Sequence, residues 1–260
     1  MDLTKENCYF GFLNMDHRID RLERMNYQLL GAGIQAVRHR GKRPEEYDLT
    51  DPKVQVMLNR TPGAIACQFG QMEIMRSAKD AGRHAIVFED DILFCSDFTK
   101  RFDYICNWSK THEWDIVWLG ASFHVNPPYW HRHGQSGMPP DCSAQLGYDC
   151  LPTDDPHMIR TFGAYVTFAY IVNYESIDKI LQYLDGFMHR TIGIDYSFIA
   201  AAKFQPDLKF FSFVPGCVMQ IDNKSDIGKG DTIWSGQLNN GPYVFQDKME
   251  NFDPTTYKWK

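Results

Sequence analysis

The sequence of 260 residues contains no long hydrophobic run. No apolar stretch approaches the about 20 residues that a helix needs to cross a bilayer. Residues 1–7 show neither the basic segment nor the apolar segment of a signal peptide. We therefore expect a soluble protein that is made and retained in the cytoplasm.

Cysteine is scarce and scattered. The seven cysteines are odd in number and include no Cys-x-x-Cys pair. A disulfide framework or a zinc site usually needs paired or closely spaced cysteines, so we expect reduced thiols. Cys67 is interpreted as a small hydrophobic residue and not as a nucleophile.

An excess of positive charge is also missing. The formal net charge of -6 argues against a protein that holds nucleic acid by bulk electrostatics. Residues 38–43 form one basic cluster, Arg-His-Arg-Gly-Lys-Arg, which we interpret as a solvated loop. The alternative is a patch that follows a phosphate backbone, which leaves nucleic acid open as a partner.

The composition predicts one folded domain. With 43% hydrophobic and 14% aromatic residues, the chain can bury a full core. It contains no internal repeat and no linker that would divide it. We therefore expect a single domain over residues 1–260, with an irregular loop insertion at about 122–160.

Apolar periodicity predicts alternating strands and helices. Thr61 is expected to cap a helix that begins at Pro62 and runs up to Gly82. Strands are predicted at 9–13, 85–88, 115–119, 164–172, 210–214 and 218–221, and further helices at 19–30, 98–108, 174–184 and 195–203. This order predicts an α/β sandwich with a mostly parallel central sheet and helices on both faces.

Three consecutive carboxylates, Glu89, Asp90 and Asp91, follow the buried strand at 85–88. Their mutual repulsion is best tolerated where water or a cation faces them. Ligands of open α/β sheets collect at the carboxyl ends of strands. Mg²⁺ and Mn²⁺ take one or two protein carboxylates and complete their shell with water and substrate phosphates. The triplet therefore predicts a Mn²⁺ or Mg²⁺ site that a nucleotide-sugar diphosphate would complete, with a solvated acidic turn as the alternative.

The segment from Ser122 to Arg160 does not follow the alternating pattern. It is rich in proline, glycine, histidine and aromatic residues, which is typical of lids and binding loops. Tyr129 and Trp130 could stack on a sugar or a base and are our candidates for acceptor binding. A zinc site at the neighbouring histidines, 131 and 133, is disfavoured because no cysteine or carboxylate lies beside them at ligand spacing.

Four blocks of the sequence carry a resemblance to a known family. They are residues 13–25 (Leu-Asn-Met-Asp-His-Arg-Ile-Asp-Arg-Leu-Glu-Arg-Met), Ala66-Cys67, Val87-Phe88-Glu89-Asp90-Asp91, and Pro215 with Gln220 and Ser225-Asp226-Ile227. In this order, over residues 9–230, they resemble glycosyltransferase family 25, the lipooligosaccharide and procollagen galactosyltransferases. One departure stands out, since this chain has Gly70-Gln71 where the family has Ser-His.

The resemblance implies a GT-A type fold, a nucleotide-sugar donor, Mn²⁺ or Mg²⁺ as the metal, and inversion at the anomeric carbon.

 The donor that we expect is thus a UDP-linked sugar, and the expected reaction transfers a hexose, galactose or glucose, to a hydroxyl group of a glycan or of another hydroxylated acceptor. A modified base in DNA stays open as a further acceptor. Two other classes also stay open, a nucleotidyltransferase and a non-catalytic sugar-nucleotide-binding protein.

The predicted roles around the donor follow from chemistry and from this resemblance. A metal neutralises a diphosphate leaving group as a Lewis acid and template. Asp91 is expected to contact the metal directly, and Glu89 to hold its water shell or the ribose. The other candidates for donor binding are Asn14, Arg21, Asp90, Ser225 and Asp226. The alternatives are that Asn14 shapes its own turn, that Arg21 pairs with nearby carboxylates, and that residues 225 and 226 belong to a plain surface loop.

Asp195 is the candidate catalytic base. An inverting displacement needs a base within hydrogen-bond reach of the acceptor hydroxyl. Asp195 precedes a late helix, where the resembling family has an aspartate. The alternative is that Asp195 is only the N-cap of that helix.

Overall fold

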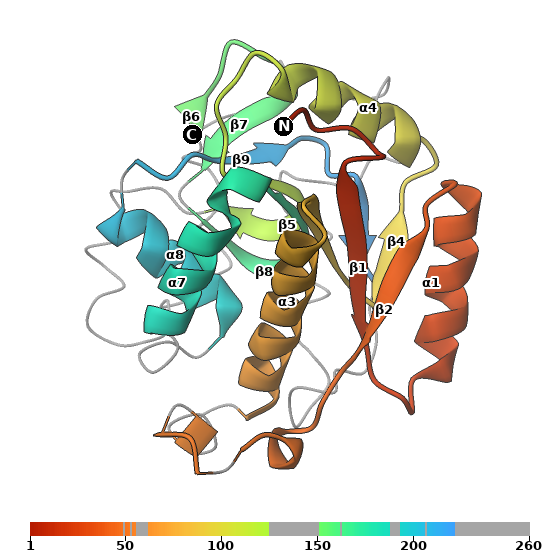
Figure 1. The fold of residues 1–260 in the computed structure, drawn as a ribbon. Helices are drawn as coiled ribbons and strands as arrows, with labels where there is room; N and C mark the ends of the chain where they lie inside the picture. The colour runs from red at the N-terminus through yellow and green to blue at the C-terminus, as the bar shows by residue number, and fades with distance from the viewer. Residues whose placement is uncertain are drawn as a thin grey trace.

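The computed structural model describes residues 1–48, 50–52, 54–55, 62–124, 151–161, 163–187, 193–205 and 207–221. Figure 1 shows these residues as a central sheet with helices packed against it. None of the helices in these ranges is long and apolar enough to cross a membrane.

The central sheet has eight strands within the described residues, in the order β2-β1-β3-β8-β5-β9-β7-β6. Their bounds are Cys8–Asn14 (β1), Ala36–Arg40 (β2), His84–Glu89 (β3), Ile116–His124 (β5), Leu151–Pro152 (β6), Met158–Thr161 (β7), Ala164–Val172 (β8) and Phe210–Phe213 (β9). From the pairings, β2, β1, β3, β5, β9 and β6 run in one direction, and β8 and β7 run in the other. Most strands therefore share a direction, although β8 separates β3 from β5.

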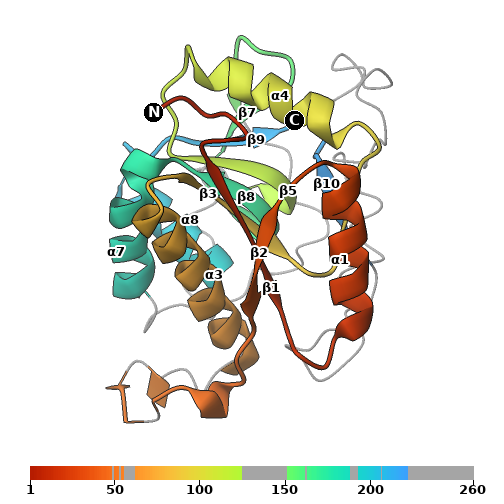
Figure 2. The ribbon, with the colours of Figure 1, turned by 45° about the vertical axis from the view of Figure 1, so that its right-hand side comes forward.

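Helices cover both faces of this sheet (Figures 1 and 2). On one face lie α1 (Ile19–Gly31) and α4 (Phe98–Ser109), and on the other lie α3 (Pro62–Asp80), α7 (Ile177–Phe187) and α8 (Ile194–Phe204). Side chains alternate across a strand, so β3 serves both layers. Its Phe88 packs in the hydrophobic core under α1 and α4, whereas Val87 packs in the core under α3, α7 and α8. The predicted fold class, an α/β sandwich with helices on both faces, is confirmed.

Most of the predicted elements are present, and the exceptions have physical reasons. β2 lies where a solvated loop was predicted, so that interpretation of the basic cluster was wrong for residues 38–40. β2 is an edge strand with largely exposed side chains, and it therefore lacks the apolar alternation that marks a strand. The short β4 (Ile92–Phe94), which pairs with β10 (Val218–Gln220), was also not predicted.

The irregular insertion is shorter than predicted at both ends. β5 continues to His124, and β6 and β7 add two strands at the far edge of the sheet. These two strands contain only two and four residues, which is too short for a periodic pattern. Residues 125–150, with the predicted acceptor-binding residues Tyr129 and Trp130, lie outside the described residues.

Candidate functional site

A pocket of about 390 Å³ lies where β1 and β3 end. Its walls come from the start of α1, the first turns of α3 and the loop at 41–45 that follows β2. The parallel pairing of β1 with β3 places their carboxyl ends side by side, as Leu13 and Glu89 are register partners. The pocket lining includes the predicted residues Asn14, Arg21, Glu89, Asp90 and Asp91.

Asp90 is held by two side chains of the protein itself. Asn14 Nδ2 donates to Asp90 Oδ2 at 2.7 Å, and Arg21 Nη1 donates to Asp90 Oδ1 at 2.7 Å. All three residues are buried. Both oxygens of Asp90 are therefore engaged within the protein, and this carboxylate anchors the end of β3 to β1 and α1.

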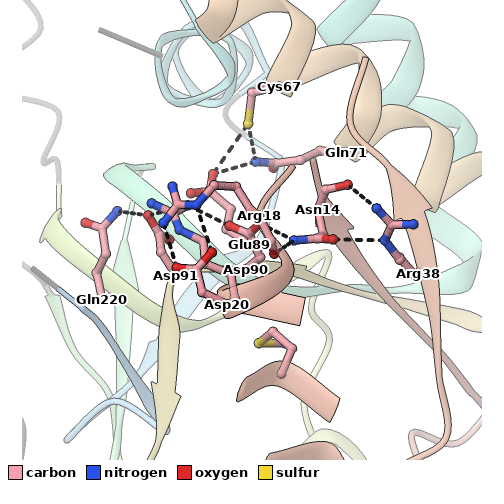
Figure 3. A network of polar contacts seen from close by, with 12 residues as sticks. Asn14, Arg18, Asp20, Arg38, Cys67, Gln71, Glu89, Asp90, Asp91 and Gln220 are labelled. Carbon is pink, nitrogen blue, oxygen red and sulfur yellow. Dashed lines mark hydrogen bonds and ion pairs between the residues drawn. The ribbon is translucent and has the colours of Figure 1, made fainter. Parts of the chain in front are cut away.

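Asn14 is committed to the same network, which Figure 3 shows from close by. Its Nδ2 also donates to the Arg18 carbonyl at 3.2 Å, and its Oδ1 accepts from Arg38 Nε at 2.9 Å. The contact with Arg18 is the turn-shaping role that we kept as an alternative. Arg38, from the basic cluster, reaches this network because β2 pairs with β1.

Glu89 is the last residue of β3 and faces the pocket. Gln71 Nε2 donates to Glu89 Oε1 at 2.9 Å, and the Cys67 thiol lies 3.5 Å from the same oxygen. Removal from water raises the pKa of Glu89 well above its usual range, and the charges of Asp91, Asp195 and Asp90 raise it further. Ionised Glu89 would therefore be unfavourable here without a compensating cation.

Asp91 carries the clearest sign of a missing partner. Its Oδ1 is buried and has no hydrogen-bond partner among the described residues. Its Oδ2 lies 3.4 Å from both Arg21 Nη1 and Gln220 Nε2. Burial raises the pKa of Asp91 despite the opposing effect of Arg21.

These observations bear on whether a divalent cation fits the site. Asp90 and Asp91 share one buried guanidinium, that of Arg21, so these two carboxylates outnumber the cation that they contact. Within the ranges that the structure describes, no group of three or more His, Cys, Asp or Glu side chains could hold a metal ion. Mg²⁺ and Mn²⁺ need only one or two protein carboxylates when phosphates and water supply the rest. The orphaned oxygen of Asp91 suits such a cation.

Asp195 lies in the first turn of α8 and is half-buried. Its charge raises the pKa of Glu89, Cys67 and Tyr170, which places it within electrostatic range of the acidic pocket. The alternative interpretation as an N-cap is wrong, because Gly193 occupies the cap position and Asp195 is the second residue of the helix.

The remaining predicted residues of the donor site, Ser225 and Asp226, lie outside the described residues. Gln71 was not among the predicted site residues, although its polar side chain is fully buried. The sequence did contain a sign of its role. Gln68 and Gln71 interrupt the apolar face of α3, the helix that precedes the strand ending at the acidic triplet. Gln220, which we had only quoted as part of a motif, reaches Asp91 because β10 pairs with β4.

Neither a protein-family model nor a curated protein sequence matches this chain. Among solved structures, mouse xyloside xylosyltransferase 1 in its apo form is similar, with 12% identity, a TM-score of 0.43, and coverage of 94% of this chain and 82% of that chain. The inositol-1-phosphate CTP transferase from T. maritima is similar with 12% identity, a TM-score of 0.36, and coverage of 90% and 78%. Both TM-scores are below 0.5, so neither similarity assigns an activity to this chain.

Proposed function

We propose that this protein is a metal-dependent glycosyltransferase that binds a UDP-linked sugar in the pocket at the ends of β1 and β3. The observation that carries this proposal is the state of Asp91, whose buried Oδ1 has no hydrogen bond from any residue that the structure describes and whose pKa is raised. A buried carboxylate of this kind is stabilised when a cation binds beside it.

In this proposal, Asp91 would hold the cation directly and Glu89 would hold its water shell or the ribose. A divalent cation bound there would neutralise the diphosphate leaving group and orient it. Asp90, Asn14 and Arg21 fix the end of β3, so that Glu89 and Asp91 keep their orientation as ligands arrive. We therefore assign these three residues a positioning role and not a direct contact with the donor.

Asp195 is our candidate for the base that removes the proton from the acceptor hydroxyl. Its support is the resemblance to family 25 and its electrostatic proximity to Glu89. The resemblance also suggests galactose or glucose as the transferred sugar, with inversion, and a hydroxyl of a glycan or another hydroxylated molecule as the acceptor.

A change at Asp91 tests the proposal. Asp91→Asn removes a carboxyl group whose ionised form is unfavourable in the folded protein. Without metal, the melting temperature of the variant should therefore equal or exceed that of the wild type. Wild-type protein should be stabilised by Mn²⁺ with UDP, by about 2.7 kcal/mol at a hundredfold excess over Kd, and Asp91→Asn should lose this stabilisation. Thermal unfolding with and without Mn²⁺ and UDP measures both effects.

Asp20→Asn is the matched control, since Asp20 is an exposed carboxylate near the start of α1 that pairs with Arg18. It should keep the response to Mn²⁺ and UDP. Equal stabilisation of the Asp91→Asn protein would contradict the metal assignment. A wild-type response to nucleoside triphosphates, without one to UDP-sugars, would indicate a nucleotidyltransferase instead.

A further inference from the structure

We propose that Gln71 is a positioning residue that orients Glu89 toward the ligands of the pocket, and that Gly70 beside it makes this contact possible. This inference rests on the proposed function, because it assigns Glu89 a partner within the same site. It concerns Gly70 and Gln71, which stand where the family that the chain resembles has Ser-His.

The hydrogen bonds of Gln71 fix the orientation of its amide. Tyr170 Oη donates to Gln71 Oε1 at 2.7 Å, so the amide nitrogen must face the other way. That nitrogen donates to Glu89 Oε1 at 2.9 Å and to Cys67 Sγ at 3.3 Å. Gln71 and Tyr170 are both fully buried, so water does not compete for these bonds.

The network engages one carboxylate oxygen of Glu89 and leaves the other for the pocket. Both hydrogen bonds that the described residues make to the Glu89 side chain end on Oε1. Glu89 lines the pocket, so Oε2 is the oxygen that can meet a ligand. In the proposed site Glu89 holds the water shell of the metal, and the outer-shell partners of a metal typically change its affinity or the activity about 10- to 100-fold when they are removed.

Two glycines allow α3 to approach β1 closely enough for this contact. A Cβ atom on Gly70 would lie 2.5 Å from Leu13 Cδ1, and one on Gly11 would lie 2.5 Å from Ile74 Cγ2. Each glycine thus accepts a side chain from the opposite element. A larger residue at position 70 would require either that Leu13 changes its side-chain conformation or that α3 moves outward, and the second change would carry Gln71 away from Glu89.

The test compares two buried glutamines on α3. Gln71→Leu keeps the approximate size of the side chain and removes the amide. Gln68→Leu is the matched control, because Gln68 is also fully buried but its amide contacts the Leu184 carbonyl and Ser197. The measurement is the Kd of Mn²⁺ by titration calorimetry in the presence of UDP, together with the melting temperature of each variant.

We expect Gln71→Leu to weaken Mn²⁺ binding about 10- to 100-fold and Gln68→Leu to leave it within about twofold. Tyr170→Phe keeps the buried ring and removes only the hydroxyl that fixes the Gln71 amide. It should therefore also weaken Mn²⁺ binding, by a smaller factor than Gln71→Leu. Tyr170→Phe also serves as the readout if Gln71→Leu does not fold.

Two outcomes would overturn the positioning role while the proposed function stands. One is a wild-type affinity for Mn²⁺ in Gln71→Leu, or in Tyr170→Phe where that variant is the readout. The other is an equal loss in Gln68→Leu, which would show a general effect of helix packing. If the wild-type protein itself binds neither Mn²⁺ nor UDP, the proposed function fails and the positioning role fails with it.

Discussion

Asp195 lies in the first turn of α8, where its negative charge is favourable, but it does not cap the helix. A carboxylate in the first turn of a helix interacts favourably with the helix dipole, by about 0.3 to 1 kcal/mol when exposed and up to about 2 kcal/mol when partly buried, as Asp195 is. Asp195→Asn should therefore lower stability by no more than about 2 kcal/mol. If Asp195 is the base, the same change should lower the transfer rate by about 10² to 10⁴, because asparagine cannot accept the proton. Denaturant unfolding and steady-state kinetics with a UDP-sugar measure the two effects.

A matched residue in the neighbouring helix provides the control for this prediction. Asp178 is the second residue of α7, as Asp195 is of α8, and it pairs with Lys79 at the surface. Asp178→Asn should have a similar small effect on stability and none on transfer. An active Asp195→Asn enzyme would mean that another group is the base.

At the level of single residues, the sequence predicted the acidic triplet and its neighbours because they follow a strand in a compact motif. Asn14 and Arg21 lie in a second short block, and both meet Asp90 in the structure. Gln71 could not be assigned in this way. Its partner Tyr170 is 99 positions away, and nothing in the local pattern predicts which strand a helix will face.

At the level of elements, Gly120 allows β10 to approach β5. The register of β5 with β8 shifts on either side of Gly120, and a Cβ atom there would lie 2.8 Å from the Val218 carbonyl oxygen. Gly120→Ala should therefore push β10 outward and lower the free energy of unfolding by about 1 to 3 kcal/mol. The displacement should also weaken the contact of Gln220 with Asp91 and hence the binding of Mn²⁺ with UDP. Denaturant unfolding and calorimetry measure these changes.

Gly31→Ala is the control for the effect of an added methyl group. Gly31 ends α1, and a Cβ atom there meets nothing within 4 Å. Alanine is the better helix former, so this variant should be as stable as the wild type or slightly more stable. If Gly120→Ala is equally well tolerated, the close approach of β10 is not required.

The elements that the sequence predicted well have a strong apolar period. β3 is buried at all positions but its last, and α1 carries Met25 and Leu29 on its buried face. The elements that were missed are short or lie at an edge, as β2, β6 and β7 do. For an edge strand, hydrogen bonds to one neighbour suffice, so its side chains need not alternate between apolar and polar.

At the level of the whole molecule, two hydrophobic cores on opposite faces of one sheet stabilise the fold. The aromatic side chains divide between them, with Phe10, Phe88 and Phe102 in one core and Trp118 and Phe198 in the other. Composition predicted a core of this size. It did not predict that β8 would be inserted antiparallel between β3 and β5, because strand order depends on contacts that are remote in the sequence.

The contribution of His84 to the stability of the whole protein should fall as the pH is lowered through the titration range of histidine. Burial lowers the pKa of His84 in the folded protein, and Tyr174 N–H donates to its Nδ1 at 3.0 Å, which requires that nitrogen to be unprotonated. In the unfolded chain, histidine binds a proton below about pH 6.5. Below that pH the unfolded state therefore holds the extra proton, and the free energy of unfolding decreases by at most about 1.4 kcal/mol per pH unit for this group.

A substitution at His84 isolates its share of this pH dependence. His84→Asn keeps an acceptor for Tyr174 N–H and removes the titrating ring, at the cost of its stacking on Trp114. The variant should be less stable at pH 7, yet its stability should fall less between pH 7 and pH 5 than that of the wild type. Urea unfolding at several pH values gives both quantities. Because carboxylates titrate in both proteins, only the difference between the two slopes reports on His84, and identical slopes would show that its ring is protonated alike in the folded and unfolded states.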